Sequence, residues 1–333
     1  MPSIYTHHLF GLEVLERIDL AELTGSTADE APAVRNAFLY GNQGPDPLYL
    51  QQAIPHSTSK QGVLAGRMHD ERTNEVLVSM QHACSDTPTK RAYGLGFLCH
   101  YLLDRAVHPL VYAETYALCD AGVEGLSRET AKSQVHAEIE TQLDQMMLTR
   151  RLGATCEQYP LSDILRPTRA VAHEVSPAFA YTLKQAFDVV VSDSLFETCS
   201  TLYRVGLLAL VSKSGIKRHL IGEVEATFRH YSYLRAVTHQ PKETPETPWS
   251  NYNHFPWPNP WGDGVICASF DELYGRALND VLATIPLWAS VGQTLESAAL
   301  WTHNVNFRGE PPAWSVASVA SRPPSPLPHI STL

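Results

Sequence analysis

Helical periodicity runs through most of this sequence and constrains its fold more than any other feature. Residues 9–23 and 31–40 carry apolar side chains at intervals of three and four between charged ones, the pattern of an amphipathic helix. No stretch alternates apolar and polar residues between hairpin turns, as a half-buried strand would. The sequence therefore predicts an all-α protein with a single multi-helix domain over residues 1–310.

Capping residues and prolines set the other expected helix boundaries. Thr87 and Pro88 form an N-cap followed by proline at the first helical position, and Pro109 is expected to end that helix at His108. Helical patterns are also predicted from Ser127 to about Arg151, from Ser176–Pro177 to about residue 238, and from 270 to about 302.

Two segments lack helical periodicity. Residues 240–264 are rich in proline and contain three tryptophans, which predicts an ordered loop because tryptophan side chains favour burial. Residues 311–333 hold six of the 23 prolines together with Ser and Ala, which predicts a disordered tail.

Charge and cysteine usage narrow the class of protein. Lys and Arg number 25 against 35 Asp and Glu, a formal charge of −10, so nucleic acid is not expected as a partner and membrane contact is expected to be at most transient. No signal peptide or transmembrane run is visible, and the six cysteines form no CxxC pair. A soluble cytoplasmic protein is expected.

The segment CHYLLDRAVHP places His100, Asp104 and His108 at i, i+4 and i+8. On a helix these side chains drift only about 80° around the axis, so they share a face, while they climb about 12 Å along it. Three ligands so far apart cannot all bind one ion. The stripe therefore favours two or more metal ions, with Asp104 between them.

The next strong helical segment, HAEIETQLD, places His136 and Glu140 at i and i+4, a spacing that lets two side chains bind one metal. Nitrogen and carboxylate donors without cysteine are typical of hydrolytic zinc sites. Spacing alone leaves the alternatives open that His100 and Asp104 are a core hydrogen-bonded pair and that His136 and Glu140 are an exposed ion pair.

Together these motifs resemble the zinc-dependent phospholipase C family, whose fold is shared with zinc-dependent single-strand nucleases. The opening PSIYTHHLFG, the loop YGNQGPDPLYL, the segment AGRMHD, the Trp-rich NHFPWPNPWGDG with SFDELYGRAL, and NVNFRGE also resemble family segments. The resemblance extends in order over about residues 2–310.

This resemblance implies two or three Zn²⁺ ions per chain, in a cleft among helices. By resemblance, Asp46, His69, His100 and Asp104 hold one ion; His108, His136 and Glu140 hold a second; His7 and the bridging Asp104 hold a third. Secreted members complete the third site with the amine of the processed chain, for which the Pro2 amine could substitute here.

The implied activity is phospholipase C-like hydrolysis, in which zinc-activated water cleaves a phosphodiester of a phospholipid. Asp104 would bridge ions, and Asp46 would position the nucleophile and could accept its proton. One alternative is a phosphodiesterase or phosphomonoesterase acting on a small soluble phosphoester or nucleotide. Another is a non-catalytic, metal-stabilised helical protein. The four-residue step from Asp104 to His108 is shorter than in the best-known secreted enzymes, and no choline-reading aromatic pocket can be mapped.

Overall fold

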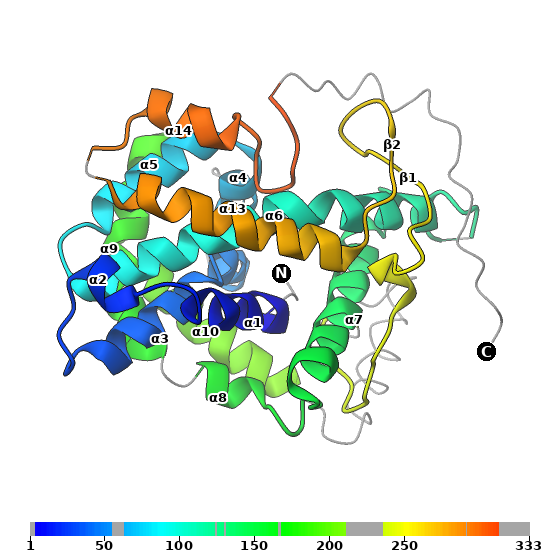
Figure 1. Ribbon diagram of the computed structural model, residues 1–333, viewed down its shortest axis with the longest axis horizontal. Coiled ribbons are helices and arrows are strands. Elements are labelled where there is room, and N and C mark those ends of the chain that lie inside the picture. Colours follow the sequence, from blue (N-terminus) through cyan, green and yellow to red (C-terminus); the bar gives the residue numbers. More distant parts are fainter. Residues whose placement is uncertain are drawn as a thin grey trace.

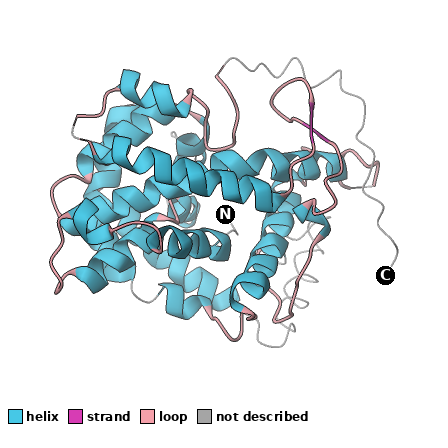
Figure 2. Cartoon of the chain, in the orientation of Figure 1, coloured by secondary structure: helices cyan, strands magenta, loops and turns pink. Residues whose placement is uncertain are grey.

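The computed structural model describes residues 4–54, 63–123, 125–129, 131–165, 168–210, 236–290 and 292–312, which fold almost entirely into helices (Figure 1 and Figure 2). The predicted all-α fold is confirmed. The helices are α1 (Ile4–Leu15), α2 (Leu20–Thr24), α3 (Ala31–Gly41), α4 (Leu64–Asp70), α5 (Thr73–Ala83), α6 (Pro88–Cys119), α7 (Lys132–Leu152), α8 (Leu161–Leu165), α9 (Thr168–Phe187), α10 (Leu195–Leu210), α13 (Phe270–Ala289) and α14 (Leu295–Thr302), with the 3-10 turns η1 (Asp46–Ala53) and η2 (Pro248–Ser250). Two short strands, β1 (Trp257–Pro258) and β2 (Val265–Ile266), pair antiparallel.

Helix α6 lies at the centre of the fold. Helices α3, α7 and α13 pack against it, and α13 crosses in front of it in Figure 1. At the α3–α6 crossing two glycines allow close approach: a Cβ at Gly41 would lie 2.2 Å from the Tyr93 carbonyl oxygen, and one at Gly96 would lie 2.1 Å from that of Phe38. The main apolar core joins side chains from α1 to the segment after α14 around this helix.

The prediction that this helix ends at Pro109 is wrong, because α6 continues to Cys119. Proline lacks the N–H that would bond the Arg105 carbonyl and so weakens a helix. Here the residues after it, Leu110 and Val111, are buried in the core. Gly309, in the left-handed region at φ 76°, packs over the gap, where a Cβ would lie 2.6 Å from Pro109 Cγ and 2.7 Å from the Arg105 oxygen. Tertiary packing thus outweighs one missing hydrogen bond.

Two predicted helix starts are also displaced. Helix α9 begins at Thr168, and Pro177 lies inside it. Ser176 does not cap α9; its Oγ accepts a hydrogen bond from the backbone N–H of Glu197, in the first turn of α10. Helix α7 begins at Lys132 rather than Ser127, whose carbonyl accepts from the N–H of the residue preceding the helix.

Three stretches predicted as helical patterns are divided between two helices where the structure describes them. In the stretch predicted from Ser176, α9 ends at Phe187 and α10 begins at Leu195. Residues 9–23 divide between α1 and α2, because the Asp19 side chain accepts from the Glu22 N–H and starts a new helix. Residues 270–302 divide between α13 and α14, where a capping box of Thr294 and Ser297 starts the second. The prediction for residues 31–40 is confirmed by α3.

The prediction of an ordered Trp-rich loop is confirmed. Its three tryptophans are 9%, 4% and 5% exposed, and their ring N–H groups donate to Gln142 Oε1, the Ala268 carbonyl and the Arg308 carbonyl. Residues 211–235, predicted to continue a helix, and residues 313–333, predicted as a disordered tail, lie outside the described residues. The domain boundary near residue 310 stays a prediction. No helix within the described ranges is both long and apolar enough to cross a membrane.

Candidate metal centre

The stripe on α6 is buried at the centre of the molecule, with its three side chains on one face as predicted. Asp104 lies between two histidines: its Oδ2 is 3.2 Å from His100 Nε2, and its Oδ1 is 3.6 Å from His108 Nε2. All three residues are at most 8% exposed. A single carboxylate is therefore in reach of both ends of the stripe.

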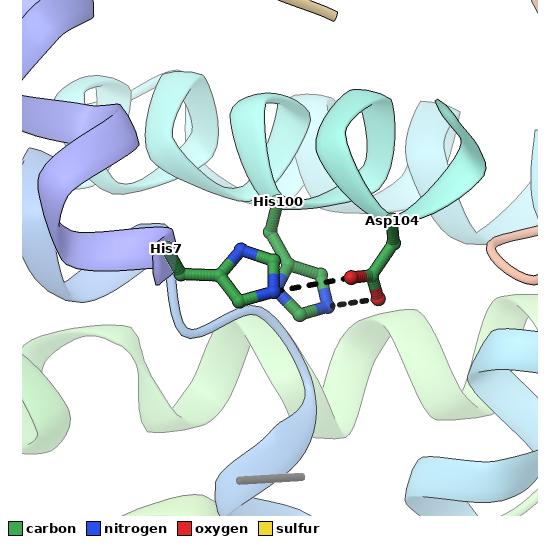
Figure 3. A group of neighbouring side chains, drawn as sticks. All are labelled: His7, His100 and Asp104. Carbon is green, nitrogen blue, oxygen red and sulfur yellow. Dashed lines mark ion pairs between the residues drawn. The ribbon is translucent and has the colours of Figure 1, made fainter. Parts of the chain in front are cut away.

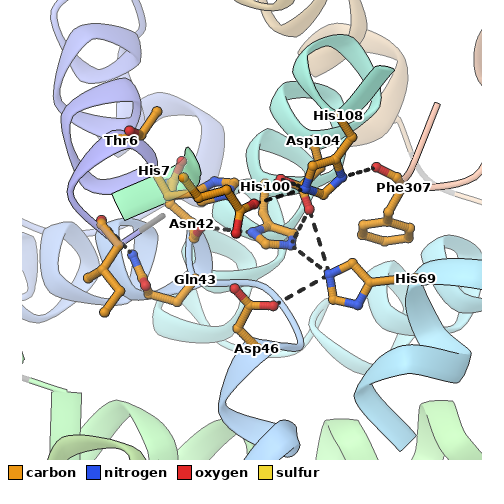
Figure 4. Close-up of polar contacts among 12 residues, drawn as sticks. Thr6, His7, Asn42, Gln43, Asp46, His69, His100, Asp104, His108 and Phe307 are labelled. Carbon is orange, nitrogen blue, oxygen red and sulfur yellow. Dashed lines mark hydrogen bonds and ion pairs between the residues drawn. The ribbon is translucent and has the colours of Figure 1, made fainter. Parts of the chain in front are cut away.

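Two further predicted ligands reach the same carboxylate from other elements, and a third, Asp46, contacts one of them. His7 of α1 brings its Nε2 to 3.1 Å from Asp104 Oδ1, beside His100 (Figure 3). His69 of α4 lies 3.6 Å from Asp104 Oδ2 and 3.4 Å from Oδ1 of Asp46, the first residue of η1 (Figure 4). Residues separated by up to 97 positions thus meet around Asp104.

Helix α7 supplies the remaining two predicted ligands. Glu140 Oε1 is 3.2 Å from His136 Nε2 and 3.3 Å from His108 Nε2. The potential donor atoms form three groups, within each of which all lie no more than 4.8 Å apart: His7, His100 and Asp104; Asp46, His69 and His100; and His108, His136 and Glu140. All eight residues predicted as ligands fall into these groups.

A close backbone approach places Asp46 in the cluster. The loop between α3 and η1 lies against the ring of His100, and Gly44 within it has a left-handed φ of 53°. A Cβ at Gly44 would lie 2.2 Å from His100 Cδ2, so a larger residue would push the loop and the ring apart. Gly44 therefore fixes how near Asp46 comes to the histidines.

Backbone carbonyls orient three of the imidazoles. The Nδ1 of His69 lies 2.7 Å from the Ala65 oxygen. Those of His100 and His108 lie 3.1 Å from the Asn42 oxygen and 2.8 Å from the Phe307 oxygen, respectively (Figure 4). A carbonyl can only accept, so each Nδ1 carries the proton and donates it. Each Nε2 is then left to face the cluster with its lone pair, the arrangement that metal-ligating histidines adopt.

Sequence reasoning missed Asp144, a fully buried residue of α7 that holds the start of α1. Its carboxylate accepts from the backbone N–H groups of Tyr5 and Thr6 at 3.1 and 2.8 Å, and lies 3.0 Å from His239 Nε2. It thereby caps the turn that presents His7. The signal was present in the sequence, because His136, Glu140 and Asp144 repeat the i, i+4, i+8 spacing of the α6 stripe.

Asp104 and Glu140 are held in their ionised form. Burial by itself would raise the pKa of Asp104, but His108, His100 and His7 hold it well below its usual range. Burial likewise opposes ionisation of Glu140, whose pKa is nonetheless well below its usual range because of neighbouring charge that includes His136. Buried carboxylates of this kind require positive partners.

The histidines divide into two kinds. Burial lowers the pKa of His7, and the charge of His100 lowers it further; burial also lowers the pKa of His136. Burial opposes the charged form of His100 and His108 too, but Asp104 raises the pKa of both, that of His108 to about 9. The carboxylates therefore favour positive charge on His100 and His108, and a divalent cation would supply the same positive charge.

The donor set fits zinc. Five imidazoles and three carboxylates converge without a thiol, the ligand chemistry of hydrolytic zinc sites. In the described part of the chain, the buried Nδ1 atoms of His7 and His136 have no hydrogen-bond partner, so these rings are not committed to a competing network.

The cluster opens into a cavity of about 390 Å³. Besides seven of the ligand candidates, its wall includes Tyr49, Tyr112, Arg128, Lys132 and Arg308. Sequence reasoning assigned no function to any of these five. Tyr49 and Arg308 lie within the family-like segments YGNQGPDPLYL and NVNFRGE, which could have identified them, whereas Arg128 and Lys132 lie in no recognisable motif.

Histidines outside the predicted set play other parts. His8, next to His7, turns away and pairs its Nε2 with the Tyr159 hydroxyl at 3.0 Å. His254 contacts the Cys267 carbonyl and does not line the cavity. His56, His219 and His230 lie outside the described residues.

Fold and site together define an all-helical protein with a buried histidine–carboxylate centre suited to metal binding. The chain belongs to the zinc-dependent phospholipase C family, whose model matches residues 6–187, more than half of its 333 residues. The matched stretch contains all eight candidate ligands. Family membership associates the chain with metal-dependent phosphoester hydrolysis. No match to it was found among curated proteins or among solved structures.

Proposed function

We propose that this chain is a zinc-dependent phosphodiesterase of the phospholipase C type. The observation that carries the proposal is the position of Asp104, whose two oxygens lie between imidazoles of three different helices on the floor of an open cavity. A carboxylate so placed can bridge metal ions, and clustered ions are suited to phosphoester hydrolysis.

The eight converging residues are proposed as the zinc ligands. Asp46, His69, His100 and Asp104 would hold one ion, His108, His136 and Glu140 a second, and His7 with Asp104 a third. Bound zinc would supply Lewis-acid stabilisation of phosphate oxygens and would make water a better nucleophile near neutral pH. Residues 1–3, including the Pro2 amine considered for the third site, lie outside the described residues.

The chain's own groups would bind and orient the reactants. Asp46 is 6% exposed and lines the cavity beside His69, where its carboxylate can hold the attacking water and accept its proton. The water oxygen would attack phosphorus in line with the departing glycerol-side oxygen, releasing diacylglycerol and a phosphorylated headgroup. The carbonyl-held imidazoles would keep the cluster from reorganising during the reaction.

Two alternatives share part of this support. A small soluble phosphoester would fit the same cavity and the acidic chain, and would be hydrolysed by the same groups. A non-catalytic, metal-stabilised protein would have no need of an open cavity beside its ligands. A cytoplasmic location stays a prediction.

Zinc content and hydrolysis of bis(p-nitrophenyl) phosphate test the proposal on protein purified without chelator. We expect two or three zinc ions per chain and activity that chelation abolishes. Asp104→Asn should reduce activity by about 10³-fold with the helical circular-dichroism spectrum retained. Asp29→Asn, at an exposed carboxylate, is the matched control and should retain full activity. A folded protein without stoichiometric metal, or equal activity in both variants, contradicts the proposal.

A further inference from the structure

The outer wall of the cavity is cationic, although the chain as a whole is acidic. Arg128, Lys132 and Arg308 line it, from the segment before α7, the first turn of α7 and the segment after α14. The chain carries a formal charge of −10, so three cations on one wall contrast with its overall composition. Glu129 is the carboxylate that shares this wall.

These cations lie near the rings of Tyr112, which lines the cavity, and of Tyr116, which lies beside it. Lys132 Nζ lies 5.0 Å from the ring centre of Tyr112 and 5.2 Å from that of Tyr116. The Arg128 guanidinium lies 4.2 Å from Tyr116, and that of Arg308 lies 5.7 Å from Tyr112. A quaternary ammonium group needs free aromatic faces. At Tyr112 protein cations already lie near the ring and would repel such a group.

Lys132 is the cation of this wall that is available to a ligand. Arg128 is paired with Asp120, and Arg308 is paired with Asp70, 2.5 Å away. Lys132 forms no ion pair with any residue that the structure describes. It is partly buried, and it begins a long helix whose N-terminal peptide dipoles favour negative charge at the same place. An anion from outside the chain would supply the partner that Lys132 lacks.

The wall lies close to the proposed zinc ligands but is distinct from them. The Tyr112 ring contacts both, at 4.7 Å from the His136 ring and 5.0 Å from Lys132 Nζ. A substrate phosphate at the cluster would therefore place its next substituent along this wall.

We propose that Lys132, supported by Arg128 and Arg308, binds a second anionic group of the substrate, a carboxylate or phosphate beside the phosphoester that is hydrolysed. This inference rests on the proposed function. It assigns the headgroup of the substrate to the anionic class rather than to the quaternary ammonium class. The anion can belong to a lipid headgroup or to a soluble phosphoester.

Three phosphomonoesters that differ in one group test the proposal by calorimetry on the full chain purified without chelator. Phosphoserine equals phosphoethanolamine plus a carboxylate, and phosphocholine carries a quaternary ammonium group. We expect phosphoserine to bind about tenfold more tightly than phosphoethanolamine, and phosphocholine to bind no more tightly. Lys132→Met should abolish the phosphoserine preference, and Lys242→Met, at an exposed lysine away from the cavity, should preserve it.

Several results would overturn this inference. One is tighter binding of phosphocholine than of phosphoethanolamine, and another is no binding of any of the three compounds. A third is an equal loss of affinity for all three in Lys132→Met, which would show that Lys132 contacts the phosphate that they share. Hydrolysis of bis(p-nitrophenyl) phosphate by the same preparation separates the two proposals. A protein that prefers phosphoserine but leaves the aryl diester intact contradicts the proposed function alone.

Substrate hydrolysis then identifies the source of the anion. Faster cleavage of dihexanoyl phosphatidylserine than of glycerophosphoserine supports a lipid headgroup, and the reverse order supports a soluble phosphoester. Either order agrees with the inference, provided that the preferred serine substrate is cleaved faster than dihexanoyl phosphatidylcholine. Preferred cleavage of the choline lipid contradicts it.

Discussion

The two ends of the cavity carry opposite charge. At the inner end, three buried carboxylates, Asp46, Asp104 and Glu140, lie among imidazoles. At the outer end, three cations lie on tyrosine rings. The inner end favours cations and the outer end favours anions, so one cavity can hold metal and direct the negative part of a substrate toward it.

The two ends also differ in how they are built. The inner end has a stripe of ligands on a single helix as its base, and backbone carbonyls orient its rings. The outer end is assembled from side chains of long reach on three segments. Metal chemistry depends on fixed distances, whereas recognition of a headgroup tolerates flexible side chains. Substitutions at the two ends should therefore have separable effects.

The largest expected effect is at the inner end. His108→Ala should lower the zinc content by about one ion per chain and the phosphodiesterase activity by about 10³-fold. Lys132→Met, at the outer end, should retain the full zinc content. Elemental analysis measures the zinc content of each variant, and hydrolysis of bis(p-nitrophenyl) phosphate measures its activity. Equal zinc loss in the two variants would show that the ends are not separable.

Gly44→Ala should disturb the inner end through the backbone. The left-handed φ and the overlap with the His100 ring together should destabilise the fold by about 3 kcal/mol and reduce zinc binding. Gly153→Ala is the matched control, because Gly153 has a φ of 59° with open space around it and should cost only about 1 kcal/mol. Chemical denaturation measures the difference, and equal losses would contradict the close approach.

Asp144→Ala tests whether the cap on α1 positions His7. Losing the cap should destabilise the fold by about 1–2 kcal/mol and weaken zinc binding about tenfold. Asp144→Asn keeps an oxygen acceptor and should recover most of both losses. Competition with a zinc-sensitive dye measures the affinity. An Ala variant that is destabilised but binds zinc normally would limit Asp144 to a structural part.

The smallest expected effect is on pH dependence. His100 and His108 have raised pKa values and carry protons at pH 6.5 and below when no metal is bound, whereas Asp104 and Glu140 are already ionised. Zinc must displace those two protons, so its affinity for each site should fall about tenfold per pH unit on acidification below pH 6.5. Calorimetry in buffers of different ionisation enthalpy counts the protons. Binding without proton release would contradict the assigned charges.

Local sequence was sufficient wherever the geometry is local. The i, i+4, i+8 spacing of the α6 stripe and the i, i+4 pair on α7 determined which side chains share a face, because a helix sets those angles regardless of its neighbours. His7, Asp46 and His69 came from resemblance to a family, and spacing alone could not have joined them to the stripe. The all-α class followed from the same periodicity.

Only tertiary structure decided the features that depend on distant residues. Helix α6 passes Pro109 because core packing outweighs a lost hydrogen bond, and Ser176 accepts from the first turn of α10 because that helix lies beside it. The Phe307 carbonyl on His108, the Asp144 cap on α1 and the cationic wall all join segments far apart in the chain. Local periodicity determines on which face of a helix each side chain lies. The packing of several elements determines which of those faces meet.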